Sequence, residues 1–409
     1  MDLKDKISLA ELLINKHKSK KETLDHLDAS LTHYLQRSAY NNDKKLKLDA
    51  IFYTKQILNA KNNGEEFAES KISKALDNSI FEPIPIPFPE QKKPQFNFID
   101  LFAGIGGFRL ALQNIGGKCT YSSEYEPNAK VTYATNFGKI PYGDITKDEI
   151  KAYIPESFDI LCGGFPCQAF SIAGHRKGFS ETRGTLFFDI QQIIEQHRPK
   201  VVFLENVKNL VTHDNGNTFK VILEILQEKL KYKVSYKVLN SMTHANVPQN
   251  RERIFIVAFD PEQVPNHANF NFPEAIPLTK TIHNILEPGK QPDKYYYSKS
   301  HMYYPTLQKS MTSVNTLYQW RRVYVRENKN NVCPTLTANM GAGGHNVPLV
   351  KDAFGIRKLT PRECFSFQGY PENYILPSYL ADSKLYMQAG NSVTTPLIER
   401  IAVKIKEVL

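Results

Sequence analysis

A thiol on a glycine-rich turn is the first feature of this sequence that suggests chemistry. Cys167 follows the apolar run "FDILC" and the turn "GGFP". Cysteines are usually buried and inert, and Cys162, inside the apolar run, fits that description. Cys167 instead lies past the end of the predicted strand, where a thiolate can act as a nucleophile if positive charge lowers its pKa. Arg176, Lys177 and Arg183 follow in a long, glycine-punctuated loop typical of segments that close over substrates.

An acid and two arginines lie at other predicted strand ends. Glu205 and Asn206 end the apolar run "VVFLENV", and a carboxyl group there can donate or accept a proton if burial raises its pKa. Arg251 and Arg253 alternate on the way into "RIFIVAF", so we expect both on one face, holding a carbonyl oxygen, a phosphate or the glutamate itself. An R-x-R pair by itself is usually a surface feature.

The segment "FNFIDLFAGIGGFRLAL" predicts a strand, a glycine turn and a helix. Such a turn lets the backbone approach a nucleotide-type ligand at the head of the helix. A dinucleotide fingerprint would need a third glycine where Arg109 stands, which disfavours a nicotinamide enzyme. Glu124 and Asp144 end the next two candidate strands, where they are suited to accept hydrogen bonds from ribose hydroxyls and from an adenine amino group respectively. Taken singly, each acid is more often an ordinary surface or capping residue.

The elements that position these residues alternate along the chain. Between residues 96 and 260, short apolar runs alternate with amphipathic stretches such as "DIQQIIEQHR" and "TFKVILEILQEKL". This alternation predicts an α/β fold with a mostly parallel sheet covered by helices on both faces. Ligands bind at the carboxyl ends of such strands, which is where the residues named above are expected.

The flanking segments differ in composition. Residues 1–80 have helical spacing and nearly balanced charge, and the five prolines within residues 81–95 predict an extended, semi-rigid linker. Residues 261–355 lack a clear periodicity. Helical pattern returns over residues 356–409, and we expect the final helix to pack against the first sheet.

Part of the irregular segment is basic and aromatic. Between Lys294 and Lys329 there are seven Lys and Arg residues and one acid, with seven tyrosines and the only tryptophan. This composition suits a nucleic-acid surface, and it suits equally a small β-rich domain with an aromatic core.

Composition excludes several classes of protein. The formal net charge of +10 favours a polyanionic partner. The five scattered cysteines lack C-x-x-C pairs, so we expect reduced thiols and no metal site. No apolar run approaches the roughly 18 residues of a membrane span, and the charged first segment does not resemble a signal peptide. The expected location is therefore the cytoplasm.

Six motifs together resemble one family. "FIDLFAGIGGFR", "GFPCQAFS", "LENVKNL", "VPQNRERIFIV", "RKLTPRECFSFQGYP" and "QAGNSV" occur in the order and at the spacing of bacterial cytosine-5 DNA methyltransferases of the restriction-modification type. The resemblance covers about residues 96–409. It implies a Rossmann-like S-adenosylmethionine-dependent methyltransferase sheet in residues 96–260, completed by 356–409, with a smaller target-recognition domain in 261–355 and an N-terminal helical extension.

The resemblance also implies a mechanism. Cys167 would attack carbon 6 of a cytosine that is flipped out of the duplex, so that carbon 5 accepts the methyl group. Glu205 would bind ring nitrogen 3 and the exocyclic amine, Arg253 the ring carbonyl oxygen, and Arg251 would steady the site or a phosphate. By similarity, the residues of the cofactor site are Phe102, Gly104, Gly106, Gly107, Glu124, Asp144, Pro166, Leu186 and Asn391.

The implied partners are double-stranded DNA and a cognate restriction endonuclease, with the chain acting as a monomer. The resemblance shifts the basic, aromatic stretch towards base and phosphate contacts, and the expected DNA-contacting residues are Ser171, Arg183, Arg321, Arg322, Arg326 and Thr335. The implied products are 5-methylcytosine and S-adenosylhomocysteine, with no metal required.

Two alternatives stay open: a transfer RNA cytosine-5 methyltransferase, and a non-catalytic DNA-binding regulator. Some relatives use N-terminal helices to bind DNA, but residues 1–80 have almost no excess positive charge, which favours a structural or partner-binding role.

Overall fold

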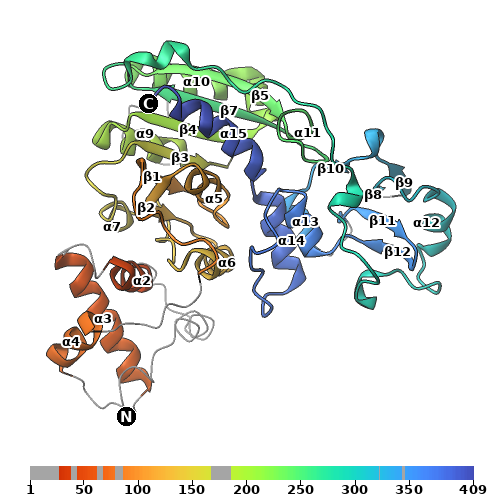
Figure 1. The fold of residues 1–409 in the computed structure, drawn as a ribbon, viewed down its shortest axis with the longest axis horizontal. Helices are drawn as coiled ribbons and strands as arrows, with labels where there is room; N and C mark the ends of the chain where they lie inside the picture. The colour runs from red at the N-terminus through yellow and green to blue at the C-terminus, as the bar shows by residue number, and fades with distance from the viewer. Residues whose placement is uncertain are drawn as a thin grey trace.

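A six-stranded sheet lies at the centre of the computed structural model (Figure 1). The structure describes residues 27–37, 44–61, 68–78, 86–166, 186–321, 323–342 and 346–409. The sheet order is β2-β1-β3-β4-β7-β5. Its strands are β1 (Phe96–Leu101), β2 (Gly117–Ser123), β3 (Ile160–Gly164), β4 (Val201–Val207), β5 (Lys233–Asn240) and β7 (Glu252–Phe259). Only β7 runs against its neighbours, so the expectation of a mostly parallel sheet is confirmed.

Helices cover both faces of this sheet. On one face, β-strand side chains such as Leu161 and Val202 pack against α9 (Leu186–His197) and α10 (Asn217–Glu224). On the other face, side chains such as Phe203 pack against α5 and α15. The bounds are α5 (Gly107–Asn114), α6 (Pro127–Phe137), α7 (Asp148–Lys151), α11 (Ser241–His244) and α15 (Thr395–Lys406). The last helix of the chain therefore docks beside the first helix of the α/β body, as predicted.

A four-stranded antiparallel sheet forms a separate lobe at the right of Figure 1. Its order is β12-β11-β8-β9, and α12 (Tyr304–Ser310) packs beside it. The strands are β8 (Tyr318–Arg321), β9 (Tyr324–Glu327), β11 (Leu349–Asp352) and β12 (Gly355–Lys358). Strand β12 spans the boundary expected at residue 355.

Most aromatic residues of the basic stretch form the core of this lobe. The ring of Trp320 stacks on Tyr303 at 4.5 Å, and Tyr318 is fully buried. Tyr297 and Tyr304 pack around the same cluster. Most of these rings therefore pack on the core of the lobe, because a small antiparallel sheet needs large apolar side chains to fill its single core. The nucleic-acid contact expected of this stretch stays a prediction.

Two short elements and a close glycine contact join the lobe to the α/β body. Strand β6 (Gln249–Asn250) pairs in parallel with β10 (Cys333–Pro334). Helices α13 (Pro361–Ser366) and α14 (Asp382–Asn391) follow the lobe in the chain. A Cβ atom on Gly390 of α14 would lie 2.1 Å from the carbonyl carbon of Thr337, so only glycine permits this approach.

The end of the proline-rich segment packs on the body. Residues 86–95 are extended, and the ring of Phe88 lies against Phe137 and Tyr374. Glu90 forms ion pairs with Lys139 at 2.5 Å and Arg109 at 3.5 Å. This part of the predicted linker is thus anchored to the body through Phe88 and Glu90, while residues 91–95 are exposed.

Three N-terminal helices form a small cluster with its own apolar core. They are α2 (Leu27–Arg37), α3 (Lys44–Lys61) and α4 (Glu69–Asn78), and Leu31, Leu58 and Ile72 are buried between them. Across the described ranges, no helix combines the length and apolar character needed to cross a membrane.

Candidate active site

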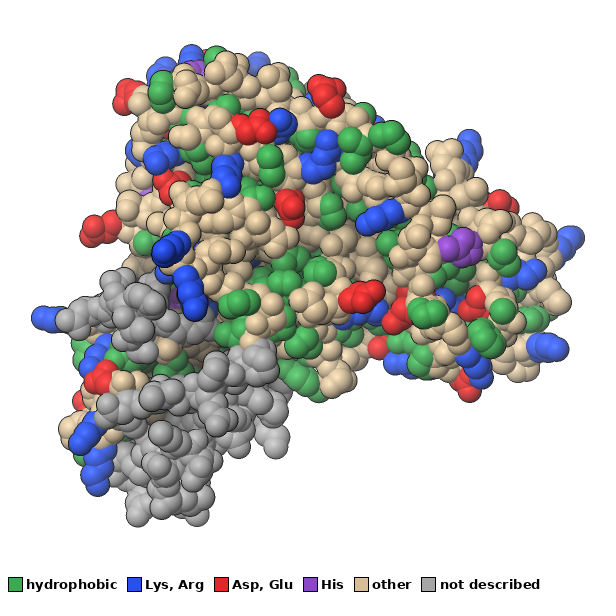
Figure 2. Space-filling view, viewed as in Figure 1, with side chains coloured by type: hydrophobic (Ala, Val, Ile, Leu, Met, Phe, Trp, Pro, Cys, Tyr) green, Lys and Arg blue, Asp and Glu red, His purple; other side chains and the backbone are tan. Residues whose placement is uncertain are grey.

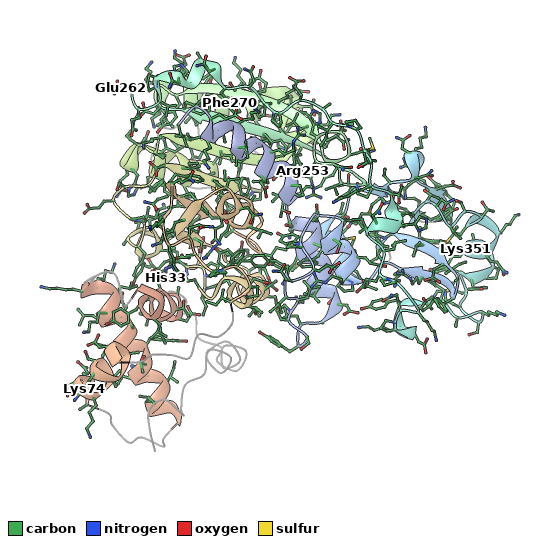
Figure 3. The ribbon with its side chains drawn as sticks, viewed as in Figure 1. His33, Lys74, Arg253, Glu262, Phe270 and Lys351 are labelled. Carbon is green, nitrogen blue, oxygen red and sulfur yellow. The ribbon has the colours of Figure 1, made fainter. Side chains whose placement is uncertain are left out.

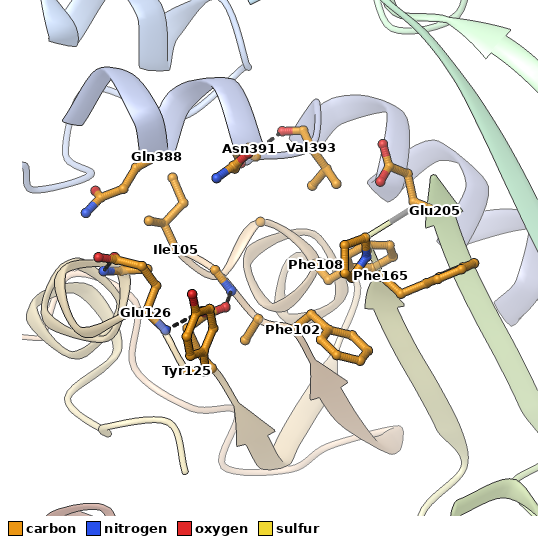
Figure 4. A pocket seen from close by; sticks show the side chains of 18 of the residues that line it. Phe102, Ile105, Phe108, Tyr125, Glu126, Phe165, Glu205, Gln388, Asn391 and Val393 are labelled. Atoms are coloured by element: carbon orange, nitrogen blue, oxygen red, sulfur yellow. Dashed lines mark hydrogen bonds between the residues drawn. The ribbon is translucent and has the colours of Figure 1, made fainter. Parts of the chain in front are cut away.

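A pocket of about 600 Å³ opens where β1, β2, β3 and β4 end (Figure 4). Its floor comes from the loops after these strands and its opposite wall from α14 and the residues that follow it. Expected site residues that line it are Phe102, Gly104, Gly107, Glu124, Asp144, Pro166, Leu186, Glu205, Arg251, Arg253 and Asn391. Eight separated stretches of sequence thus meet at the carboxyl edge predicted for ligands.

Among the described residues expected in the catalytic and cofactor sites, Gly106 is the one that does not line the pocket. Its φ of 81° is in the left-handed region, and a Cβ atom there would lie 2.3 Å from the ring of Phe137. Gly106 therefore permits the turn and the packing behind the pocket, while Gly104 and Gly107 present their backbone to it.

Glu124 braces the glycine loop. One of its carboxylate oxygens accepts a hydrogen bond from the Gly104 backbone N–H at 2.7 Å, and the other accepts one from Glu126 N–H at 2.8 Å. Burial raises the pKa of Glu124, although these backbone donors oppose the shift. The carboxyl group is thus fixed at the end of β2, facing the pocket.

Asp144 and an unexpected tyrosine lie at the same end of the pocket. One oxygen of Asp144 accepts hydrogen bonds from the backbone N–H and the hydroxyl of Thr146 at 3.0 and 2.9 Å, which leaves its other oxygen for a ligand. Tyr125 lines the pocket while 74% exposed. Our sequence reasoning missed Tyr125, although an aromatic residue directly after a strand-end acid was a visible signal.

Glu205 and Arg253 form an ion pair at the other end of the pocket. The Arg253 Nε atom lies 3.0 Å from a Glu205 carboxylate oxygen, and Glu205 is only 8% exposed. Burial raises the pKa of Glu205, while the charges of Arg253 and Arg251 oppose that rise. A carboxyl group with a raised pKa holds its proton to higher pH than usual and can donate it to a ligand.

Arg251 is buried and turned towards backbone carbonyls. Its guanidinium donates to the carbonyl oxygens of Leu336, Gly390 and Ser392. Burial and the neighbouring charge of Arg253 lower the pKa of Arg251 to about 9, so it stays charged at neutral pH. These contacts correspond to the steadying role expected for it, since they tie β6, the segment after β10 and the end of α14 together.

Asn206 holds the backbone at the end of β3. Its amide group donates to the carbonyl oxygen of Phe165 at 2.8 Å, two positions before the cysteine. Cys167 itself, with Ser171 and Arg183, lies outside the described residues. Cys162 is fully buried and donates to the Ile99 carbonyl oxygen; burial raises the pKa of the Cys162 thiol well above its ordinary value, so the prediction of an inert core residue is confirmed.

A second hollow of about 410 Å³ lies on the small lobe. Arg321, Arg326 and Thr335 all line it, whereas Arg322 lies outside the described residues. Most of the further lining residues are amides, with one lysine: Asn250, Gln319, Asn328, Lys329, Asn330, Asn339 and Asn346. The Thr335 hydroxyl is already used within the protein, since it donates to the Asn250 carbonyl oxygen at 2.6 Å.

Lys and Arg side chains are interspersed with Asp and Glu on the face shown in Figure 2 rather than gathered in one patch. The described residues on that face therefore form no basic patch that would mark a DNA-binding surface. The hollow on the small lobe is a candidate because of its arginine and amide lining. Within the described ranges, no three His, Cys, Asp or Glu side chains come together as metal ligands.

Comparison with known proteins identifies one family. The family model described as C-5 cytosine-specific DNA methylase matches residues 96–407. The chain is 54% identical over 310 residues to the Type II methyltransferase M.Bsp6I of Bacillus sp. (strain RFL6), covering 75% of this chain and 96% of that relative. It is 44% identical over 358 residues to M.HpaII of Haemophilus parainfluenzae, covering 82% and 95% respectively.

The fold has counterparts among solved structures. The crystal structure of S. pombe Dnmt2 methyltransferase superposes with a TM-score of 0.56 at 19% identity, covering 76% of this chain and 98% of that one. An Entamoeba histolytica methyltransferase structure gives a TM-score of 0.56 at 18% identity, covering 76% and 98%. Both likenesses show the shared fold.

Proposed function

Because the chain belongs to the C-5 cytosine-specific DNA methylase family and is a DNA cytosine-5 methyltransferase that uses S-adenosylmethionine, we propose that it modifies one cytosine within a short duplex sequence. The observation that carries this proposal is the Glu205–Arg253 pair, 3.0 Å apart, at the rim of the pocket that Gly104, Glu124 and Asp144 line. A cytosine edge and an adenosine-type cofactor thus have matching groups in one cavity.

The pocket fits the adenosine part of S-adenosylmethionine. Glu124 supplies a fixed carboxyl group for ribose hydroxyls, and the free oxygen of Asp144 can accept from an adenine amino group. Phe102, Ile105 and Tyr125 supply apolar and aromatic walls, and Asn391 faces them from α14. When bound, the cofactor supplies an electrophilic methyl group on a positively charged sulfur.

The residues at the other end act on the cytosine. In the proposed reaction the Cys167 thiolate bonds to carbon 6, and the electron pair of the carbon 5–carbon 6 double bond makes carbon 5 nucleophilic. The Glu205 carboxyl group donates to ring nitrogen 3, where negative charge develops, and Arg253 binds the ring carbonyl oxygen. After carbon 5 gains the methyl group it loses its proton to a base, and expulsion of the thiolate restores the double bond.

The target base must leave the duplex for this reaction, because its carbon 6 is inaccessible in the stacked helix. We propose that the small lobe binds duplex DNA through Arg321 and Arg326, and that Ser171, Arg183 and Arg322 add further contacts. We propose that the enzyme acts as a monomer. Its relatives' names indicate a restriction-modification setting, so a cognate endonuclease is the proposed functional partner.

Covalent trapping tests the proposed mechanism. A duplex with 5-fluorocytosine at the target position blocks the final proton loss, so the wild-type enzyme should stay covalently attached in the presence of cofactor. Cys167→Ser should leave no adduct, whereas Cys162→Ser should still form one. Absence of an adduct from protein that binds S-adenosylhomocysteine would contradict the covalent mechanism.

Substrate class is tested by transfer of a labelled methyl group. We expect label on unmethylated plasmid and none on transfer RNA, followed by bisulfite sequencing to read the site. Label confined to RNA would support the transfer RNA alternative instead. No label on either substrate, from protein that binds DNA, would support the regulator.

A further inference from the structure

A stack of aromatic rings links the N-terminal helices to the edge of the cofactor pocket. The ring of Tyr142 lies between Tyr121 at 5.1 Å and Tyr153 at 4.6 Å, nearly parallel to both. His33 of α2 lies against the same ring at 4.9 Å. Figure 3 labels His33 where the N-terminal helices meet the α/β body. Tyr142 is therefore held by rings from both units.

Helix α2 also fixes the backbone beside this stack. The Thr32 hydroxyl oxygen accepts a hydrogen bond from the Ile140 backbone N–H at 3.1 Å, and both residues are buried. Ala29, one turn earlier, is fully buried within the main core cluster of the α/β body. The contact thus combines apolar burial with a hydrogen bond that a buried N–H needs.

Helix α3 holds the outer ring of the stack. Asp49 accepts a hydrogen bond from the Tyr153 hydroxyl at 2.7 Å. The Lys45 ammonium group lies 4.2 Å from the centre of the same ring, a cation–π distance. Two N-terminal helices therefore contact the segment that runs from Ile140 to Tyr153.

That segment carries cofactor-site residues. The Tyr142 backbone N–H donates to the Ser122 carbonyl oxygen at 2.8 Å, and its carbonyl oxygen accepts from the Glu124 N–H at 2.8 Å. Asp144 follows two positions later at the pocket wall. Any displacement of Tyr142 would thus move both acids that face the pocket.

We propose that α2 and α3 are a positioning unit for the cofactor site, holding Glu124 and Asp144 in place through Thr32, His33 and the tyrosine stack. The inference rests on the proposed role of these two acids in cofactor binding. Fixing them before the cofactor arrives lowers the ordering cost of binding. The family model begins at residue 96, so this unit lies outside the part of the chain that the family defines.

Steady-state kinetics of the full-length chain test the inference. Thr32→Val keeps the side-chain volume and removes the acceptor for Ile140 N–H, and Asp49→Ala removes the Tyr153 partner. Each should raise the KM for S-adenosylmethionine and the Kd for S-adenosylhomocysteine by about three- to tenfold, the effect of one lost hydrogen bond. The kcat and the KM for DNA should stay within about twofold. Lys55→Ala, which breaks only the exposed pair with Glu69, is the matched control and should change none of these values.

The outcomes separate this inference from the assignment of the acids. Asp144→Ala and Glu124→Ala should each raise the KM for the cofactor; if neither does, the cofactor-site assignment fails and the positioning inference fails with it. If both do while Thr32→Val and Asp49→Ala leave cofactor binding unchanged, the positioning inference alone is overturned. An equal loss of cofactor affinity, DNA affinity and kcat in Thr32→Val would also overturn it, because that pattern reflects general destabilisation.

Discussion

At the scale of single residues, Glu205 combines a raised pKa with a fixed orientation. Its carboxyl group is almost completely buried beside Arg253. Burial favours the protonated form, and Arg253 opposes it without cancelling the shift. The proposed proton donor to ring nitrogen 3 must be protonated when substrate binds, so we expect the environment of Glu205 to set the pH range of catalysis.

We therefore expect the single-turnover rate to fall as pH rises through the raised pKa of Glu205, because the carboxyl group then loses the proton it donates. Glu205→Gln should lower the rate by about 100-fold or more, since an amide cannot transfer a proton. The variant should also lack the alkaline decline. Glu252→Gln, at an exposed neighbouring position, is the control. An alkaline decline that persists in Glu205→Gln would assign it to another group.

Asn206 offers a second prediction at this scale. Its amide is the hydrogen-bond donor to the Phe165 carbonyl oxygen, on the approach to Cys167. Asn206→Ala leaves that carbonyl without its partner, so adduct formation with a 5-fluorocytosine duplex should slow about tenfold, as expected for a lost buried hydrogen bond. Asn209→Ala changes the same residue type at an exposed position and should react at the wild-type rate. Equal rates in the two variants would exclude a positioning role for Asn206.

At the scale of elements, the extended segment before β1 neutralises charges inside the body. Lys139 is fully buried and Arg109 is 1% exposed, and both pair with Glu90. Burial tends to raise the pKa of Glu90, but Lys139 and Arg109 outweigh it and lower the pKa below its ordinary value. Arg109 stands where a dinucleotide-binding turn would have its third glycine. The positive charge at this position is paired with Glu90, which the segment before β1 supplies.

Glu90→Gln should consequently destabilise the fold. It removes the negative charge that pairs with these two buried cations, and the loss from breaking a buried pair is about 3 kcal/mol. Because the folded pKa is lowered, the stabilisation by Glu90 is present above the ordinary Glu pKa of about 4.3 and is lost as pH falls through the folded value. Thermal unfolding at neutral and acidic pH measures both effects. Glu407→Gln, which loses only an exposed pair with Lys404, should unfold like the wild type.

The same elements show what the sequence could predict. Alternating apolar runs located the six strands of the main sheet, because period and length are local properties. The meeting of the strand-end acids in one pocket was also predictable, since parallel strands bring their carboxyl ends together. The ion pairs of Glu90 and the carbonyl partners of Arg251 were not predictable, because they lie far away in sequence; only a general steadying role for Arg251 was expected. The tyrosines of the small lobe show a related limit: composition cannot distinguish a ring that fills a core from one that faces a ligand.

At the scale of the whole molecule, we propose that two separate hollows bind different ligands. The pocket of the α/β body holds the groups suited to cofactor and cytosine, and the hollow of the small lobe holds Arg321, Arg326 and several amides. Arg251 joins the lobes, since its guanidinium binds carbonyl oxygens on both sides of the joint. Substitutions in one hollow should therefore affect one ligand, while those at the joint should affect both.

Arg326→Ala tests this division. A guanidinium that contacts a guanine edge contributes about 1–3 kcal/mol of discrimination, so the variant should bind its cognate duplex about tenfold more weakly and discriminate less against single-base mismatches. Its KM for S-adenosylmethionine should not change. Thr32→Val should show the reverse, with a raised KM for the cofactor and an unchanged KM for DNA. Lys309→Ala removes an equal charge from an exposed site on α12 of the same lobe and controls for net charge. Arg326→Ala could instead weaken the binding of cognate and mismatched duplexes equally and lower the salt dependence of binding by about one phosphate contact. That result would show that Arg326 contacts the DNA backbone. The base contacts would then belong to the amide side chains around Arg326.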